Sequence, residues 1–83
     1  MMTKFDLKHL LAVVEHGSFS KAAKALNVSQ PYLSNRVKTI EASVHTELLN
    51  RKTHPLSLTE AGELYVQSVQ KLEQDYKFLL RAI

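Results

Sequence analysis

The sequence lacks cysteine and tryptophan, and its 83 residues include only two glycines and two prolines. Without cysteine the chain has neither disulfides nor a thiolate metal site, so we expect a reducing compartment, the cytoplasm. Two glycines are too few for a phosphate-cradling loop or for the glycine-flanked elbow that presents a nucleophilic serine. No apolar run is long enough to span a membrane. We therefore expect one small domain with a modest core.

The four histidines do not form a recognisable metal site. None is paired with another at metal-ligand spacing beside a carboxylate, although His9 and His16 lie seven residues apart on one predicted helix. We interpret all four histidines as exposed surface side chains. The sequence accordingly predicts no enzyme, no metal and no cofactor.

Positive charge gathers in the middle of the chain. Residues 17–57 carry six lysines and arginines against two glutamates, a net +4, while the whole chain has a formal charge of +3. Residues 58–83 carry three basic against four acidic side chains, a net −1. The middle segment is therefore the part suited to neutralising phosphates.

Residues 18–41, SFSKAAKALNVSQPYLSNRVKTIE, predict two helices joined by a tight turn. The first consists of strong helix formers, and Ser18 or Ser20 can cap its start. Asn27 stands where the chain must reverse, and asparagine tolerates the left-handed backbone conformation. Ser29 is then the expected N-cap of the second helix.

One face of the second helix is polar. Leu33, Val37 and Ile40 recur at helical spacing and predict the buried stripe. At about 100° per residue, the opposite face carries hydrogen-bonding and basic groups, as a reader of the DNA major groove requires. These residues are Pro31, Asn35 and Lys38, flanked by Ser34 and Thr39. A merely solvated face has the same pattern, so periodicity alone leaves both interpretations open.

The flanking segments read as a helix and a hairpin. Residues 6–16 have the pattern of an amphipathic helix that ends at Gly17. Residues 47–58 predict a short hairpin whose basic tip contains Arg51 and Lys52. Such a tip is either a wing that contacts DNA or a solvated loop.

The last helix, capped by Thr59, has apolar residues at alternating spacings of four and three, which is typical of a coiled-coil seam. So small a body cannot bury the whole seam, and we predict a homodimer. The alternative is that the first two turns pack back on the 6–16 helix. The seam residues are Tyr65, Val69, Leu72, Tyr76, Leu79 and Ile83.

These motifs together resemble the N-terminal DNA-binding domain of LysR-type bacterial transcriptional regulators. The matching strings are Gly17-Ser18-Phe19-Ser20, Ala22-Ala23, Leu26, Ser29-Gln30-Pro31, Leu33-Ser34, Ile40-Glu41, Leu48, Arg51 and Leu58-Thr59-Glu60-Ala61-Gly62. The resemblance covers the whole chain in order. It implies a winged helix-turn-helix, a dimerising linker helix and operators with interrupted two-fold symmetry.

The resemblance also implies site residues. The family's base-reading positions fall on Gln30, Pro31, Ser34 and Asn35. We assign the DNA backbone to Ser18, Ser20, Lys21, Tyr32, Arg36, Lys38, Arg51 and Lys52. The chain departs from the family pattern at several positions: Asn35 replaces a common arginine, which favours adenine over guanine. Arg36 replaces glutamine and suits a phosphate or an intrachain carboxylate, Tyr32 replaces a small residue, His45 a glycine and Leu49 a phenylalanine.

We therefore expect a mainly α protein. A winged helix-turn-helix of three helices and a small two-stranded wing occupies residues 1–58, and a long dimerising linker helix occupies 59–83. The family's effector-binding domain is absent from these residues, and the apolar pattern at Ile83 favours a truncated chain; a small-molecule effector would act only through that domain. The expected partners are double-stranded DNA and a second copy. The alternative is a helix-turn-helix module for protein–protein contact with only non-specific DNA affinity.

Overall fold

The computed structural model describes residues 4–83, with side chains from Leu7 onward. The first three residues of the predicted 1–58 unit lie outside the described residues. The elements run in the order α1 (Lys4–His16), α2 (Phe19–Leu26), α3 (Gln30–Val44), β1 (Leu49–Asn50), β2 (Ser57–Leu58) and α4 (Glu60–Ala82). Over the described residues the fold is mainly helical with a small hairpin, which confirms the predicted fold class.

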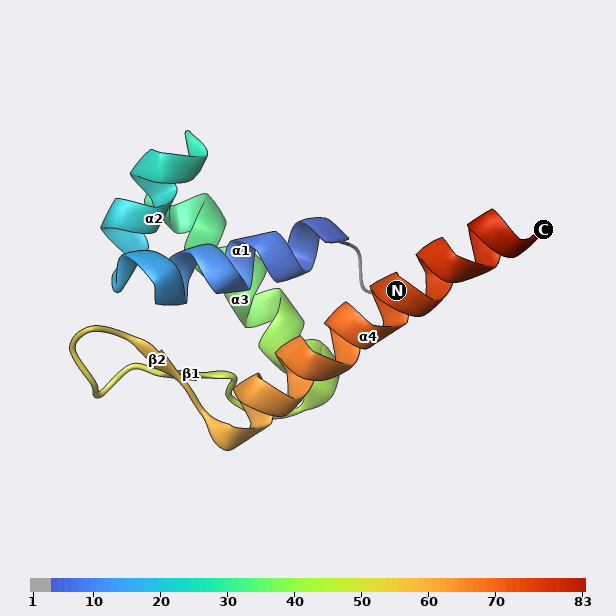
Figure 1. Ribbon diagram of the computed structural model, residues 1–83. Coiled ribbons are helices and arrows are strands. Elements are labelled where there is room, and N and C mark those ends of the chain that lie inside the picture. Colours follow the sequence, from blue (N-terminus) through green and yellow to red (C-terminus); the bar gives the residue numbers. More distant parts are fainter. Residues whose placement is uncertain (1–3) are drawn as a thin grey trace.

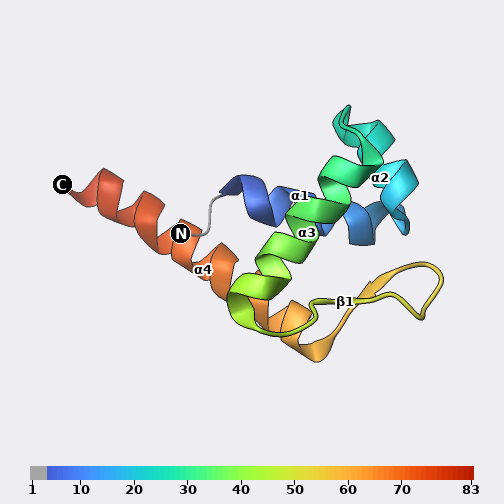
Figure 2. The same ribbon diagram turned by 180° about the vertical axis from the view of Figure 1, so that it is seen from behind.

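Helices α1, α2 and α3 form the body, and α1 packs against both of the others (Figures 1 and 2). The predicted buried stripe of α3 is confirmed, since Leu33, Val37 and Ile40 are all buried. Burial on α1 extends around much of the helix, because α1 lies against α2, α3 and the start of α4. The largest fully buried side chains are Leu10, Val13, Leu33, Val37, Leu48 and Leu49.

The wing is an antiparallel pair of two-residue strands, with Leu49 opposite Leu58 and Asn50 opposite Ser57. So short a ladder is marginal alone and depends on its attachment to the helices. On the β1 side, α4 passes so close that a Cβ at Gly62 would collide with the carbonyl oxygen of Leu48. Glycine at position 62 therefore allows the start of α4 to pack directly against the backbone that leads into the wing.

Helix α4 begins in the core and ends outside it. Thr59 is its N-cap, with Oγ1 accepting a hydrogen bond from the Gly62 N–H at 3.0 Å. Tyr65, Val66 and Val69 are buried in the body, after which the helix projects away from it (Figures 1 and 2). The first turns of α4 thus share the core of the other helices. The predicted boundary between residues 58 and 59 divides a DNA-binding segment from a dimerising one, and this division of function remains a prediction.

Candidate nucleic-acid interface

The α2–turn–α3 unit is held by the caps that the sequence predicts. Ser18 caps α2, with Oγ accepting from the Lys21 N–H at 3.2 Å, and Ser29 caps α3, with Oγ accepting from the Tyr32 N–H at 3.2 Å. Between the two helices Asn27 adopts the left-handed conformation, at φ 57°. The turn is therefore specified locally, which fixes the angle at which α3 is presented.

The polar face of α3 is open to solvent. Gln30, Pro31, Asn35 and Lys38 are exposed on the described surface, and Ser34 is half-buried at the edge. The helix carries no acidic residue in its first turn, so its positive dipole end is not neutralised by a side chain of its own. The four predicted base-reading residues thus lie together on the first half of α3.

Tyr32 lies on the flank of this face, next to α1. Its side chain is 41% exposed, and its ring makes an edge contact with the His9 ring, with centroids 5.8 Å apart. His9 itself is only 2% exposed, so the interpretation of all four histidines as surface side chains was wrong for this one. Val13, one helical turn after His9, is buried as well. This apolar residue at a spacing of four was the sequence signal that could have placed His9 on the buried side of α1.

The predicted backbone-contacting residues at the start of α2 are accessible. Ser20 and Lys21 are exposed, whereas Ser18 is half-buried and its hydroxyl is engaged in capping. On the other elements Lys38 and Lys52 are exposed, and Arg36 is half-buried and makes an interaction within the chain. The cations most available to phosphates are therefore the lysines.

Arg51 is paired within the protein. Its Nη2 donates to Glu41 Oε1 at 2.8 Å and its Nη1 to Glu41 Oε2 at 3.2 Å, so the contact is bidentate. The same carboxylate accepts the Leu48 and Leu49 backbone N–H groups. From the sequence we predicted a phosphate or an intrachain carboxylate as the partner of Arg36, and a phosphate as the partner of Arg51. The partner of Arg51 was missed because Glu41 lies ten residues earlier and only the fold brings the two together.

This pairing shifts the pKa of both groups. Burial alone would raise the pKa of Glu41, but the Arg51 guanidinium and the two backbone N–H groups outweigh it and hold that pKa below its ordinary value. The hydrogen bonds from Arg51 to Glu41 raise the pKa of Arg51 in turn. Glu41 is therefore ionised and bonded throughout the neutral pH range.

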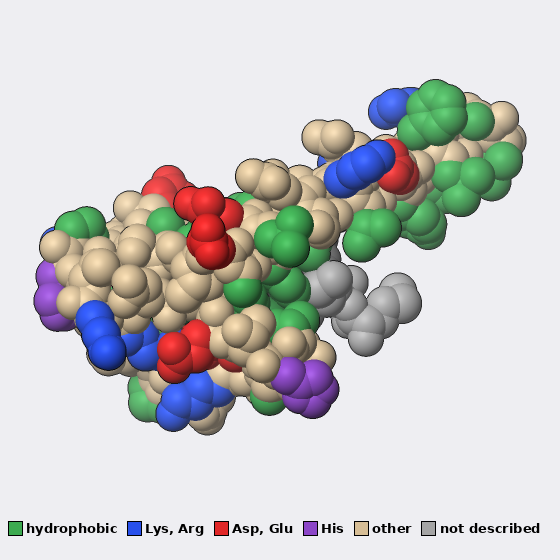
Figure 3. Space-filling model, turned by 90° about the horizontal axis from the view of Figure 1, so that it is seen from below, with side chains coloured by type: hydrophobic (Ala, Val, Ile, Leu, Met, Phe, Trp, Pro, Cys, Tyr) green, Lys and Arg blue, Asp and Glu red, His purple; other side chains and the backbone are tan. Residues whose placement is uncertain are grey.

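The predicted dimer seam divides into two parts. Tyr65 and Val69 are buried in the chain's own core, so the open alternative of packing back on the body is correct for these two residues. The remaining four are exposed by between 51% and 88%, and Figure 3 shows hydrophobic side chains gathered on the projecting end of α4. Phe78 and Leu80 are exposed there as well. The exposed seam residues are Leu72, Tyr76, Leu79 and Ile83.

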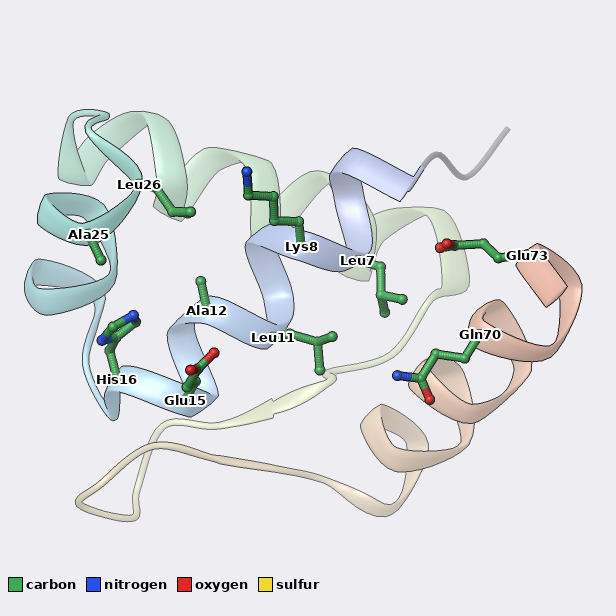
Figure 4. Close-up of a pocket in the computed structure, with 10 residues that line it drawn as sticks. All are labelled: Leu7, Lys8, Leu11, Ala12, Glu15, His16, Ala25, Leu26, Gln70 and Glu73. Carbon is green, nitrogen blue, oxygen red and sulfur yellow. The ribbon is translucent and has the colours of Figure 1, made fainter. Parts of the chain in front are cut away.

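A groove lies between α1, α2 and α4, away from the polar face of α3. Figure 4 shows Leu7 and Leu11 of α1 near Gln70 and Glu73 of α4, with Leu26 of α2 further along. Its lining is mostly apolar. In the part of the chain that the structure describes, no group of three metal-ligating side chains comes together, and no helix is long and apolar enough to cross a membrane.

Taken together, a helix-turn-helix with an open polar second helix, followed by a two-stranded wing, defines a winged helix-turn-helix DNA-binding domain. The family described as "Bacterial regulatory helix-turn-helix protein, lysR family" matches residues 5–63. The chain therefore belongs to the lysR family and is the DNA-binding domain of a transcriptional regulator rather than an enzyme, as predicted.

Known proteins similar to this chain agree with that assignment. The HTH-type transcriptional regulator BudR of Klebsiella aerogenes is 42% identical over 66 residues, which are 80% of this chain and 46% of BudR. The crystal structure of the BenM DBD/catB site 1 DNA complex has a TM-score of 0.78 at 33% identity, covering 95% of this chain and 85% of that one. Vibrio fischeri DarR in complex with DNA has a TM-score of 0.79 at 30% identity, covering 96% and 27%.

The chain spans only part of the length of the curated regulators it matches, between 22% and 46% for three of them. Its similarity to BenM DBD, in contrast, extends over most of that chain. The similarity therefore concerns the DNA-binding portion of these regulators.

Proposed function

We propose that this chain binds double-stranded DNA sequence-specifically as a homodimer, with one α3 helix in each of two major grooves of a two-fold-related operator. The observation that carries the proposal is the first half of α3, where exposed polar side chains surround an unneutralised helix N-terminus. The DNA complexes of BenM DBD and DarR, both similar in fold, support it.

Within this proposal the side chains divide into two kinds. Gln30, Pro31, Ser34 and Asn35 face base edges, because they lie where α3 enters the groove. Phosphates are contacted along both sides of the groove and fix the register without reading sequence. The backbone-contacting set is Ser18, Ser20, Lys21, Tyr32, Arg36, Lys38 and Lys52. Arg51, which the sequence also assigned to the backbone, is paired with Glu41 and contributes by holding the wing in place.

The dimer forms through the projecting half of α4 in this proposal. Leu72, Tyr76, Leu79 and Ile83 offer one apolar stripe that the chain itself leaves exposed, and a second copy covers it most simply. Residues 1–58 then serve to bind DNA and 59–83 to dimerise and to link to an effector-binding domain, in the bacterial cytoplasm where the operator lies.

Selection of duplexes from a random pool tests this proposal. The 83-residue protein is used to enrich bound DNA, and the recovered sequences are aligned. We expect an interrupted two-fold motif whose half-sites are separated by about one helical turn or a multiple of it. Recovery of no common motif, with equal binding of all duplexes, would favour a module for protein–protein contact instead.

A further inference from the structure

One carboxylate, that of Glu41, makes the polar attachment between the wing and α3 among the described residues. Glu41 lies in the last turns of α3, and its Oε2 accepts the Leu48 N–H at 2.7 Å and the Leu49 N–H at 3.2 Å. These are the residues that lead into and begin β1. The first strand of the wing therefore starts from a fixed point on the helix that carries the base-reading face.

Arg51 extends this attachment beyond the strand. Its guanidinium forms the bidentate pair with Glu41 on one side and lies 5.9 Å from the centre of the Phe19 ring on the other. The Glu41 side chain is 11% exposed and that of Arg51 34%. Such a planar fork between a carboxylate and an aromatic ring restricts the guanidinium to one geometry, so Arg51 is one point at which α2, α3 and the wing meet.

The second strand is fastened elsewhere. The Leu56 N–H donates to the Gly17 carbonyl oxygen at 3.0 Å, which ties the returning arm to the turn between α1 and α2. The tip between the two anchors begins at Lys52, whose N–H donates to Asn50 Oδ1 at 3.1 Å and whose side chain is exposed. Leu48 and Leu49 are buried in the core, and the Leu48 carbonyl oxygen accepts the Thr59 N–H at 3.0 Å, so these residues stay in place without Glu41. Loss of the Glu41 contacts would therefore loosen mainly the part of the first arm beyond Leu49, which carries Arg51 and Lys52.

We propose that Glu41 is a positioning residue for DNA binding: through Arg51 and the start of β1 it aims the wing so that Lys52 reaches a phosphate. Arg51 then helps to hold the wing in place, and its guanidinium is paired with Glu41 within the protein rather than with a phosphate. The inference rests on the proposed DNA-binding function and adds to it the residue that couples the wing to the recognition helix.

A double-mutant cycle on DNA binding tests the proposal. Glu41→Gln, Lys52→Ala and the double variant are titrated against a selected duplex at several salt concentrations. We expect each single change to weaken binding about tenfold and the double variant to lose little more, because both remove the same phosphate contact. The slope of log affinity against log salt should fall by about one for each bound chain in all three variants.

Glu15→Gln is the matched control, since it removes the same charge from an exposed position on α1. A Glu41→Gln variant that binds as tightly as the parent, or losses that multiply to about a hundredfold, would overturn the inference. Tighter binding by Glu41→Gln would also overturn it, because Arg51 would then be a phosphate ligand that Glu41 restrains.

Two further measurements separate misfolding and failure of the proposed function from failure of the inference. If Glu41→Gln does not fold by circular dichroism, Arg51→Lys replaces it in the cycle, because lysine keeps the charge and loses the bidentate fork. If the parent protein does not discriminate selected from random duplexes, the proposed function fails. Discrimination by the parent with no coupling between positions 41 and 52 rejects only the role of Glu41.

Discussion

At the scale of single residues, Asn35 is the side chain on which base preference most depends in this account. It is exposed in the middle of the polar face, between the α3 N-terminus and Lys38. Its backbone carbonyl also accepts a hydrogen bond from Thr39 Oγ1 at 2.9 Å. An exposed side-chain amide at this place can donate a hydrogen bond to N7 of adenine and accept one from its N6 amino group in the major groove.

Asn35→Ala should therefore cost about 1–3 kcal/mol on a selected duplex and much less on a random one. Lys38→Ala is the matched comparison, because it lies on the same face and should weaken binding to both duplexes alike. Fluorescence anisotropy with the two duplexes measures both effects. Equal losses on both duplexes for Asn35→Ala would place this residue among the backbone contacts.

Glu41 also makes stability depend on pH. Its pKa is lowered in the folded protein, so its ionised form stabilises the fold above the unfolded-state value near 4.5, and this contribution is lost as pH falls below that value. Glu41→Gln should cost about 1.5–3 kcal/mol at pH 7, the usual range for hydrogen bonds to a charged group. In urea unfolding the difference from the parent should shrink from pH 5 to pH 3; a constant difference would mean that charge is not the cause.

At the scale of the elements, helix ends are where local sequence and structure agree most closely. Ser18, Ser29 and Thr59 all cap as their positions predict. Asn27 and His45 both end helices in the left-handed conformation, at φ 57° and 56°. Asparagine tolerates that conformation through its short polar side chain, whereas histidine at 45 stands where the family commonly has glycine.

His45→Gly should consequently stabilise the protein by about 0.5–1 kcal/mol, the relief of left-handed strain less the extra entropy of glycine in the unfolded chain. Asn27→Gly is the internal comparison and should gain less. Urea unfolding midpoints of the two variants test this. A His45→Gly variant less stable than the parent would show that the imidazole contributes contacts that outweigh the strain.

The sequence predicted these elements because their signals are local, but it could not supply the contacts between elements. Caps, the turn at Asn27 and the buried stripe of α3 depend on neighbours within a few residues. The pairing of Glu41 with Arg51, the burial of His9 and the division of the seam after Val69 depend instead on which surfaces meet. The roles of the recognition-face residues remain predictions from position.

At the scale of the whole molecule, α4 gives the protein its extended shape, 43 Å along its longest axis and 19 Å along its shortest. The 23-residue helix is about 34 Å long, and its second half lies outside the body. Leu72 is the first seam residue beyond the core, 59% exposed. A stripe of this kind is unusual on a chain that remains monomeric.

Leu72→Asp should place a charge in the dimer seam and yield monomers with much weaker affinity for the two-fold operator. Gln74→Asp, which adds the same charge on another side of α4, is the control and should remain dimeric. Sedimentation velocity measures the assembly and circular dichroism the fold. A Leu72→Asp protein that sediments as a dimer would place the interface elsewhere.

Sequence-specific binding by a dimer is tested most directly by the fluorescence anisotropy of a selected duplex and a scrambled duplex, each titrated with the protein at several salt concentrations. We predict two chains per selected duplex, an affinity at least about a thousandfold above that for the scrambled one, and a steep loss of affinity with salt on both. Equal, weak binding to the two duplexes would contradict the account.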